Sequence, residues 1–179
     1  MSRRSVSLAV RLSAVLAAAL PLGGSLAGAP SEDEVKVAFI LNFIKYTTWP
    51  ASSGDDATLR ICADHAQALG GRLDALGGRQ VSGRTIRVLA PVRPADWRGC
   101  QVLYLSRPDA ATLADGLRAV APAPVLTVSD MPDFVDAGGM IGLKLRADRV
   151  RFDINQGAAR RGGLVLSSQL LKLADEVKP

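Results

Sequence analysis

The sequence predicts an α/β fold, a single-domain sandwich in which helices flank a mainly parallel, partly mixed β-sheet. Short apolar runs alternate with helical patterns between residues 58 and 128, and glycines and prolines separate them. The run 101–105 is apolar over almost its whole length, which is typical of a central strand covered on both faces. Alternation of this kind favours helices packed over a mainly parallel sheet.

The first helix of the predicted domain begins near Glu32. Ser31 precedes it, and Glu34 follows Ser31 at the spacing of a capping box, in which each side chain satisfies a backbone N–H group of the other residue. Apolar residues lie on nearly all faces of this helix, which indicates burial on several sides or docking on a partner. Trp49-Pro50 ends the stretch, because a residue before proline is pushed out of the α region. One face is expected to carry Val35, Ala38, Phe39, Asn42, Phe43 and Tyr46.

The middle of the chain supplies the alternating elements. We expect strands at 58–63, 85–89, 101–105 and 125–128, and helices at 66–76 and 108–120. The glycines at 77 and 78 stop the first of these helices. The segment 90–100 leaves two connections open: a crossover without a full helix, or a change of strand direction.

The last third of the chain has a different pattern. Runs at 140–145 and 149–154 predict a β-hairpin, with Ala147-Asp148 near its turn. A short helix is expected from 155 to 160, where Gly162-Gly163 follows as a break. The apolar spacing in 164–177 predicts a terminal helix.

The N-terminal segment reads as a targeting signal. Residues 1–29 are predicted to form a secretory signal peptide, and residues 30–179 the exported domain. Arg3 and Arg4 give a charged start, and the apolar stretch 12–22 is too short to span a bilayer. An uncleaved N-terminal anchor is the alternative. Export would place the domain in an oxidising compartment, where a disulfide persists.

Much of the basic character of the chain lies in that same segment. The formal net charge is +5, but without Arg3, Arg4 and Arg11 there are 19 basic against 17 acidic residues, or +2. A nucleic-acid-binding function therefore loses its main electrostatic support.

Cys62 and Cys100 are the two cysteines, 38 positions apart. In an exported protein one disulfide is the simplest arrangement, and two buried free thiols are the alternative. Cys62 lies late in one predicted strand and Cys100 at the start of another. If these strands are parallel neighbours, a disulfide requires a shifted register, or a Cys100 that already lies alongside the middle of the first strand.

Catalytic and metal-binding patterns are weak. His65 is the one histidine, Asp64 beside it gives no useful triad geometry in sequence, and no nucleophile-elbow motif occurs. One histidine and two cysteines without ligand spacing do not indicate zinc. The glycine pairs match no phosphate-binding loop and read as turns. The sequence therefore predicts no catalytic residue, no metal and no cofactor.

The predicted hairpin carries a cationic face. Lys144 and Arg146 share one face of its first strand, and Arg149, Arg151 and Asp153 share one face of its second. If these faces coincide, four cations line up around one carboxylate and form a site for an anionic ligand or an acidic partner. The alternative is that the charges discourage edge-to-edge aggregation.

Tyr46 and Trp49 are the aromatic side chains most suited to a partner contact, because Tyr and Trp are enriched at binding hot spots. Core packing at the end of the first helix is the alternative interpretation.

Several blocks of the sequence together resemble the YfiR family. They run, in order, A-F-I-L-N-F-I-K-Y-T-T-W-P from Ala38, Cys62, G-R-T-I-R-V from Gly83, Cys100 with Q-V-L-Y-L-S, V-L-T-V-S-D from Val125, F-V-D-A-G-G-M-I from Phe134, V-R-F-D-I-N from Val150 and L-S-S-Q-L-L-K-L-A from Leu166. The resemblance spans about residues 32–177.

This resemblance implies an α/β sandwich in the periplasm, a probable homodimer, and a disulfide between Cys62 and Cys100 whose redox state tunes folding. It also implies a regulator without enzymatic activity, which binds the periplasmic sensor domain of a membrane diguanylate cyclase and represses cyclic-di-GMP synthesis. Two other functions stay open: a periplasmic module that binds a small anionic metabolite, and an exported hydrolase that depends on His65.

Overall fold

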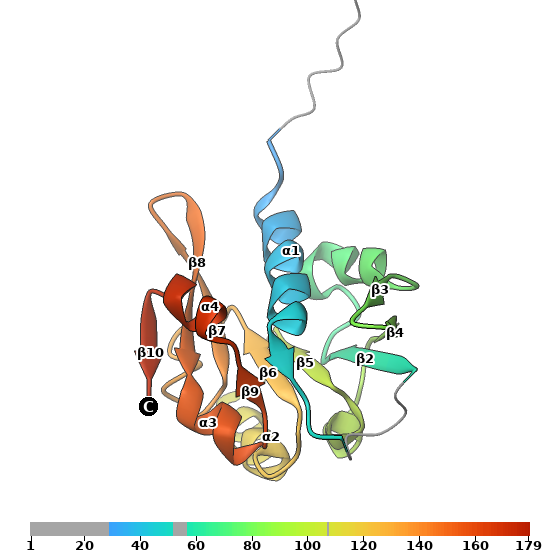
Figure 1. The fold of residues 1–179 in the computed structure, drawn as a ribbon, viewed down its shortest axis with the longest axis vertical. Helices are drawn as coiled ribbons and strands as arrows, with labels where there is room; N and C mark the ends of the chain where they lie inside the picture. Colours follow the sequence, from blue (N-terminus) through green and yellow to red (C-terminus); the bar gives the residue numbers. More distant parts are fainter. Residues whose placement is uncertain (1–28, 52–56, 107) are drawn as a thin grey trace, which may run out of the picture.

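A computed structural model describes residues 29–51, 57–106 and 108–179 and confirms the α/β fold class (Figure 1). Within these residues the chain forms an eight-stranded mixed sheet in the order β10-β8-β7-β6-β5-β2-β4-β3, and a separate two-stranded ribbon, β1-β9. The predicted signal peptide falls, apart from Ala29, outside the described residues. None of the described helices combines the length and apolar character that crossing a bilayer requires.

The strands are β1 Thr47–Thr48, β2 Thr58–Ala63, β3 Gln80–Val81, β4 Arg84–Leu89, β5 Val102–Leu105, β6 Leu126–Ser129, β7 Ile141–Arg146, β8 Arg149–Asn155, β9 Val165–Leu166 and β10 Glu176–Lys178. The α-helices are α1 Glu32–Lys45, α2 Ala110–Val120, α3 Gln156–Arg161 and α4 Ser168–Leu173, and the 3₁₀ segments are η1 Ala68–Leu76 and η2 Pro94–Gly99.

The pairing of β2, β4, β5, β6 and β7 is parallel throughout. β3 and β8 run antiparallel to their neighbours β4 and β7. The open question of segment 90–100 is thereby settled: β4 and β5 lie on opposite sides of β2 and point the same way, and η2 makes the crossover between them.

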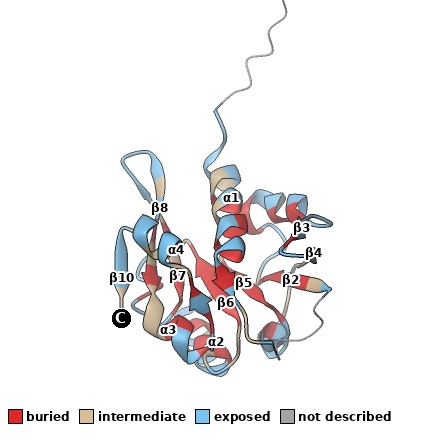
Figure 2. Ribbon diagram, in the orientation of Figure 1, coloured by how far each residue is buried: buried red, intermediate tan, exposed pale blue. Residues whose placement is uncertain are grey.

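Alternating side chains of β5 point to two separate hydrophobic layers. Val102 and Tyr104 pack into the cluster beneath α1, whereas Leu103 and Leu105 pack into the cluster beneath α2 and η2. In the second layer Trp97 lies directly over Gly116 of α2, where an added Cβ would fall 2.0 Å from its ring. Figure 2 shows the resulting buried centre of the sheet between exposed helical surfaces.

Helix α1 begins as predicted. The Ser31 N–H donates to Glu34 at 2.8 Å, the Glu34 N–H donates to the Ser31 hydroxyl at 3.3 Å, and the hydrogen bonds from Ser31 lower the pKa of Glu34. On the face that carries Val35 and Phe39, Ala38 and Asn42 are exposed. The buried residues are Lys36, Val37, Ile40, Leu41, Phe43 and Ile44. A helix apolar all round offers several equivalent faces, and contact with the sheet decides between them.

Two predicted helices were wrong in extent. The helix expected at 66–76 is a 3₁₀ segment, because Leu69, Gly70 and Gly71 adopt left-handed backbone angles with φ of 50°, 60° and 75°. The terminal helix expected at 164–177 is the six-residue α4. β9 pairs with β1 before it, and the Asp175 N–H donates to the Phe152 carbonyl at 2.9 Å after it, so that the chain ends as strand β10.

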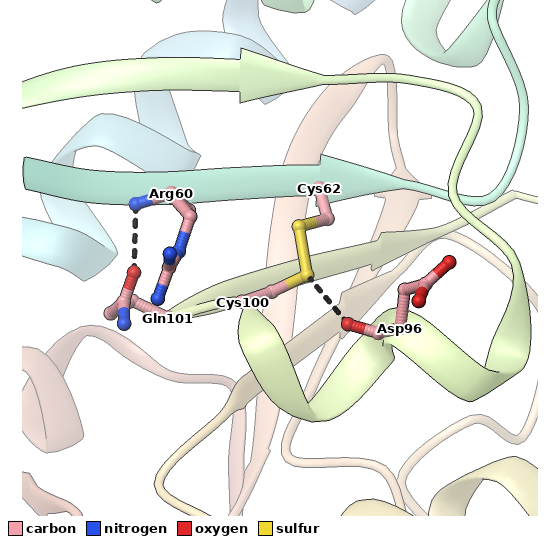
Figure 3. Close-up of a disulfide and its surroundings, with 5 residues drawn as sticks. All are labelled: Arg60, Cys62, Asp96, Cys100 and Gln101. Carbon is pink, nitrogen blue, oxygen red and sulfur yellow. Dashed lines mark hydrogen bonds between the residues drawn. A yellow bond between two sulfur atoms is a disulfide. The ribbon is translucent and has the colours of Figure 1, made fainter. Parts of the chain in front are cut away.

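A disulfide joins Cys62 to Cys100, with their Cα atoms 5.9 Å apart (Figure 3). The Gln101 N–H donates to the Arg60 carbonyl, and Val102 pairs with Ile61, so β5 starts beside the middle of β2. Of the two arrangements that allow the bond, the structure has the one in which Cys100 lies alongside the middle of the first strand. Both cysteines are buried, Cys62 completely.

We expect the disulfide to act as a structural link that reductant cannot reach in the folded state. Replacing both cysteines by alanine should lower the free energy of unfolding in urea by about 2–4 kcal/mol, because the bond closes a long loop of the unfolded chain. Dithiothreitol should leave the wild-type bond intact in native buffer and reduce it rapidly near the unfolding midpoint. Equal rates of reduction in both conditions would contradict this.

Candidate functional site

The strongest candidate site lies at the carboxyl ends of β2, β5 and β6. After β2 the chain forms η1 on the face of the sheet that α1 covers, and then returns as β4 on one side of β2. It next forms β5 on the other side of β2. Helix α2 follows β5 and covers the opposite face of the sheet. Loops that diverge in this way open a crevice between adjacent strands, the usual ligand position in open α/β sheets.

A cavity of about 740 Å³ occupies this position. The first turn of α1, the loop into η1 and the segments that follow β5 and β6 form its walls. It is lined by Asp33, His65, Gln67, Ala68, Leu69, Gly70, Tyr104, Ser106, Pro108, Asp130, Met131 and Pro132. Its size is within the range of small-molecule sites, and its lining mixes apolar and polar groups as such sites do.

A charged network closes one side of the cavity. The Lys36 ammonium is 2.6 Å from the Asp130 carboxylate and 2.7 Å from that of Glu32, and the Lys36 side chain is only 8% exposed. Asp130 also makes a side-chain hydrogen bond with the buried Tyr104 hydroxyl. The network thus connects α1 to the ends of β5 and β6.

The environment fixes the protonation of this network. Burial alone would lower the pKa of Lys36, but its hydrogen bonds to Asp130 and Glu32 raise that pKa above its ordinary value, so the ammonium stays charged. Burial, together with the negative charge of Asp130, strongly raises the pKa of Tyr104, so the phenol stays a neutral hydrogen-bond donor.

His65 and Ser106 line the cavity, and Asp64 is bonded to Ser106 beside it. The Ser106 hydroxyl donates to Asp64 at 2.7 Å, and the Ser106 N–H donates to the same carboxylate. His65 is exposed, and its Nδ1 accepts the N–H of Gln67 at 3.1 Å. The serine is thus bonded to the aspartate and not to the histidine, which is not the nucleophile–base contact of a triad. In the described part of the chain no cluster of His, Cys, Asp and Glu is arranged to hold a metal ion.

The two aromatic residues predicted to contact a partner lie at the other end of α1. Tyr46 is 37% exposed, and its carbonyl accepts the Ser167 N–H at 2.9 Å. Trp49 is half-buried against the main core, and its indole N–H is buried without an acceptor among the described residues. Tyr46 is therefore accessible, whereas Trp49 mainly supports the surface around it.

The four predicted anion-binding cations lie on one hairpin face, since Lys144 pairs with Arg151 across the strands and Arg146 with Arg149. Carboxylates already engage the first strand: Lys144 is 2.6 Å from Asp153, and Arg146 is 3.5 Å from Asp175. The accessible charge of this face comes from Arg146, Arg149 and Arg151 on the projecting, exposed end of the hairpin (Figures 1 and 2). Anion binding there stays a prediction.

The cavity and the network beside it were not predicted from the sequence. One signal was present: Asp64, Ser106 and Asp130 each come directly after an apolar strand. The carboxyl ends of parallel strands meet at one edge of a sheet, so such residues converge. Lys36, a charged residue within an apolar helix, was a second signal.

Comparison with known proteins gives two findings. The sequence model of a protein family described as YfiR/HmsC-like matches residues 33–175. The crystal structure of a conserved domain protein from Vibrio cholerae O1 biovar El Tor strain N16961 is similar in fold, with a TM-score of 0.55 and 14% sequence identity. The similarity covers 83% of this chain but 60% of that one, less than two thirds of its length.

We expect the contact between Lys36 and Asp130 to stabilise the fold. Lys36→Met should lower the free energy of unfolding by about 2 kcal/mol, less than for a fully buried pair, because Asp130 is 28% exposed and water can solvate it. Urea denaturation of K36M, D130N and the double variant should give a coupling energy of about 1 kcal/mol or more.

The exposed Lys45 in the last turn of α1 provides the control, since K45M should change stability by only a few tenths of a kcal/mol. Additive effects of K36M and D130N would show that the two side chains do not interact.

Proposed function

Because the chain belongs to the YfiR/HmsC-like family, we propose that it is a periplasmic regulatory protein that binds the periplasmic sensor domain of a membrane diguanylate cyclase and holds the cyclase inactive. In this proposal residues 1–29 direct export and residues 30–179 form the regulatory domain. The protein acts by binding and catalyses no reaction.

The extent of the family match carries this proposal. It runs from the first turn of α1 to Asp175, directly before β10, and so includes both helical layers and every strand of the main sheet except that edge strand. The family consists of regulators, and a match of this extent favours the same role for the whole domain rather than for one motif.

The contact surface proposed for the cyclase is centred on the β1-β9 ribbon. Tyr46 is 37% exposed and Val165 is 64% exposed. Thr48 pairs with Val165, and the Tyr46 carbonyl accepts the Ser167 N–H, so both apolar side chains come from the same small ribbon. We call Tyr46 and Val165 the ribbon patch. An exposed tyrosine beside an apolar side chain has the composition of a binding hot spot.

The disulfide would tune this regulator through its stability. Cys62 is completely buried and Cys100 is 4% exposed, so a reductase can reach the disulfide only after η2 opens. Loss of the bond would then raise the unfolded fraction, release the cyclase, and link the redox state of the compartment to cyclic-di-GMP. A homodimer with the ribbon patch left accessible is compatible with this scheme.

The proposal predicts that the ribbon patch is required for repression. Deletion of the gene should raise cellular cyclic-di-GMP, and the wild-type gene should restore the low level. Replacing Tyr46 and Val165 by serine should weaken binding to the cyclase sensor domain at least about 10-fold and prevent restoration, because the central apolar contacts of an interface carry most of its energy.

The matched control is Leu145→Ser, which removes another exposed apolar side chain, 54% accessible, from the hairpin. It should bind and repress like the wild type. The proposal fails if the ribbon variant represses normally at equal protein level, or if deletion leaves cyclic-di-GMP unchanged.

A further inference from the structure

We propose that the cavity at the carboxyl ends of β2, β5 and β6 binds a small molecule that carries a protonated amine, with Asp33 as its carboxylate acceptor. This site is separate from the proposed cyclase contact. Asp33 and Tyr46 lie at opposite ends of α1, about 20 Å apart at the rise of an α-helix.

The position of the cavity gives the first argument. The crevice lies where the strand order reverses between β2 and β5, and residues of both post-strand segments line it. Tyr104, which is 1% exposed, is one of the residues that line it. A pre-formed hollow of about 740 Å³ has room for a ligand of metabolite size.

The charge of the lining gives the second argument. Among the described residues that line the cavity are two carboxylates, Asp33 and Asp130, and no lysine or arginine. Lys36 pairs with Glu32 and Asp130 beside the cavity. The charge of the described lining therefore favours a cation, and the attraction between opposite charges is stronger in a low-dielectric pocket than in water.

Asp33 is the acceptor still available to a ligand. It is half-buried at the cavity wall and enters no ion pair in the described part of the chain. Gly70 stands opposite, and a Cβ there would come within 3.1 Å of the Asp33 carboxylate. The absence of a side chain at position 70 keeps that oxygen open toward the cavity. The apolar residues Leu69, Pro108, Met131 and Pro132 would cover the uncharged part of the ligand.

The test uses three aromatic probes of similar size and different charge: benzylamine, benzyl alcohol and benzoate. Calorimetric titration of the mature protein should show saturable binding of benzylamine, at least 10-fold weaker binding of benzyl alcohol, and no binding of benzoate. Added sodium chloride should weaken the benzylamine affinity, because the interaction is between charges.

Variants locate the site. Asp33→Asn should weaken benzylamine binding at least 10-fold while leaving the melting temperature of the free protein within a few degrees, since Asp33 forms no ion pair with another described residue. Asp74→Asn, an exposed carboxylate on η1, is the matched control and should bind like the wild type. Gln67→Trp at the cavity rim should weaken binding by obstruction without a change of charge.

No saturable benzylamine binding, equal affinity for benzoate, or an unchanged affinity in D33N would each overturn the proposal. Repression of a cyclase through the ribbon patch would be unaffected by any of these results, so the two proposals fail separately.

Discussion

The structure depends on how helix α1, which has apolar residues on several faces, is fixed on the mixed sheet. Apolar contacts alone do not fix the rotation of α1, because Ile40, Phe43 and Ile44 are buried while Phe39 on a neighbouring face also packs against the core. The buried ammonium of Lys36 distinguishes one orientation, since it must reach the Asp130 carboxylate at the end of β6. Rotation of the helix by one residue would leave that charge unpaired in an apolar layer, which is costly.

This orientation relates the two ends of the helix to two different surfaces. At its first turn, Glu32 and Asp33 join the carboxyl ends of the strands and complete the cavity. At its last turn, the chain enters β1 and pairs with β9, which places Tyr46 and Val165 on the outside. The disulfide holds the opposite layer by joining β2 to the segment before β5. One helix therefore connects the cavity with the ribbon patch.

Much of the fold could be predicted from the sequence because its local signals agree with its tertiary contacts. The apolar run 58–63 is β2, the capping box at Ser31 starts α1, and Ala147-Asp148 turn the hairpin with φ of 48° and 57°. The predictions fail where contacts between residues distant in the sequence determine the local structure. Leu69 takes a left-handed conformation while it is buried, and the 164–177 segment is divided between two strands and a short helix by pairing with β1 and β8.

The cavity shows more clearly what could not be predicted from the sequence. His65, Tyr104 and Asp130 line one cavity only because β2, β5 and β6 are neighbours in the sheet. Strand order is not encoded in periodicity, so the individual residues were visible and their convergence was not. The cationic hairpin was the opposite case, since a local turn fixes its register.

The contact between Lys36 and Asp130 fixes α1 and, through it, both ends of the helix. Hydrogen–deuterium exchange of the D130N variant tests this most directly. Exchange should become faster along α1 and in the β1-β9 ribbon, with unchanged protection in β8 and in the η2 region beside the disulfide. Unchanged exchange in α1, or an equal increase throughout the domain, would contradict it.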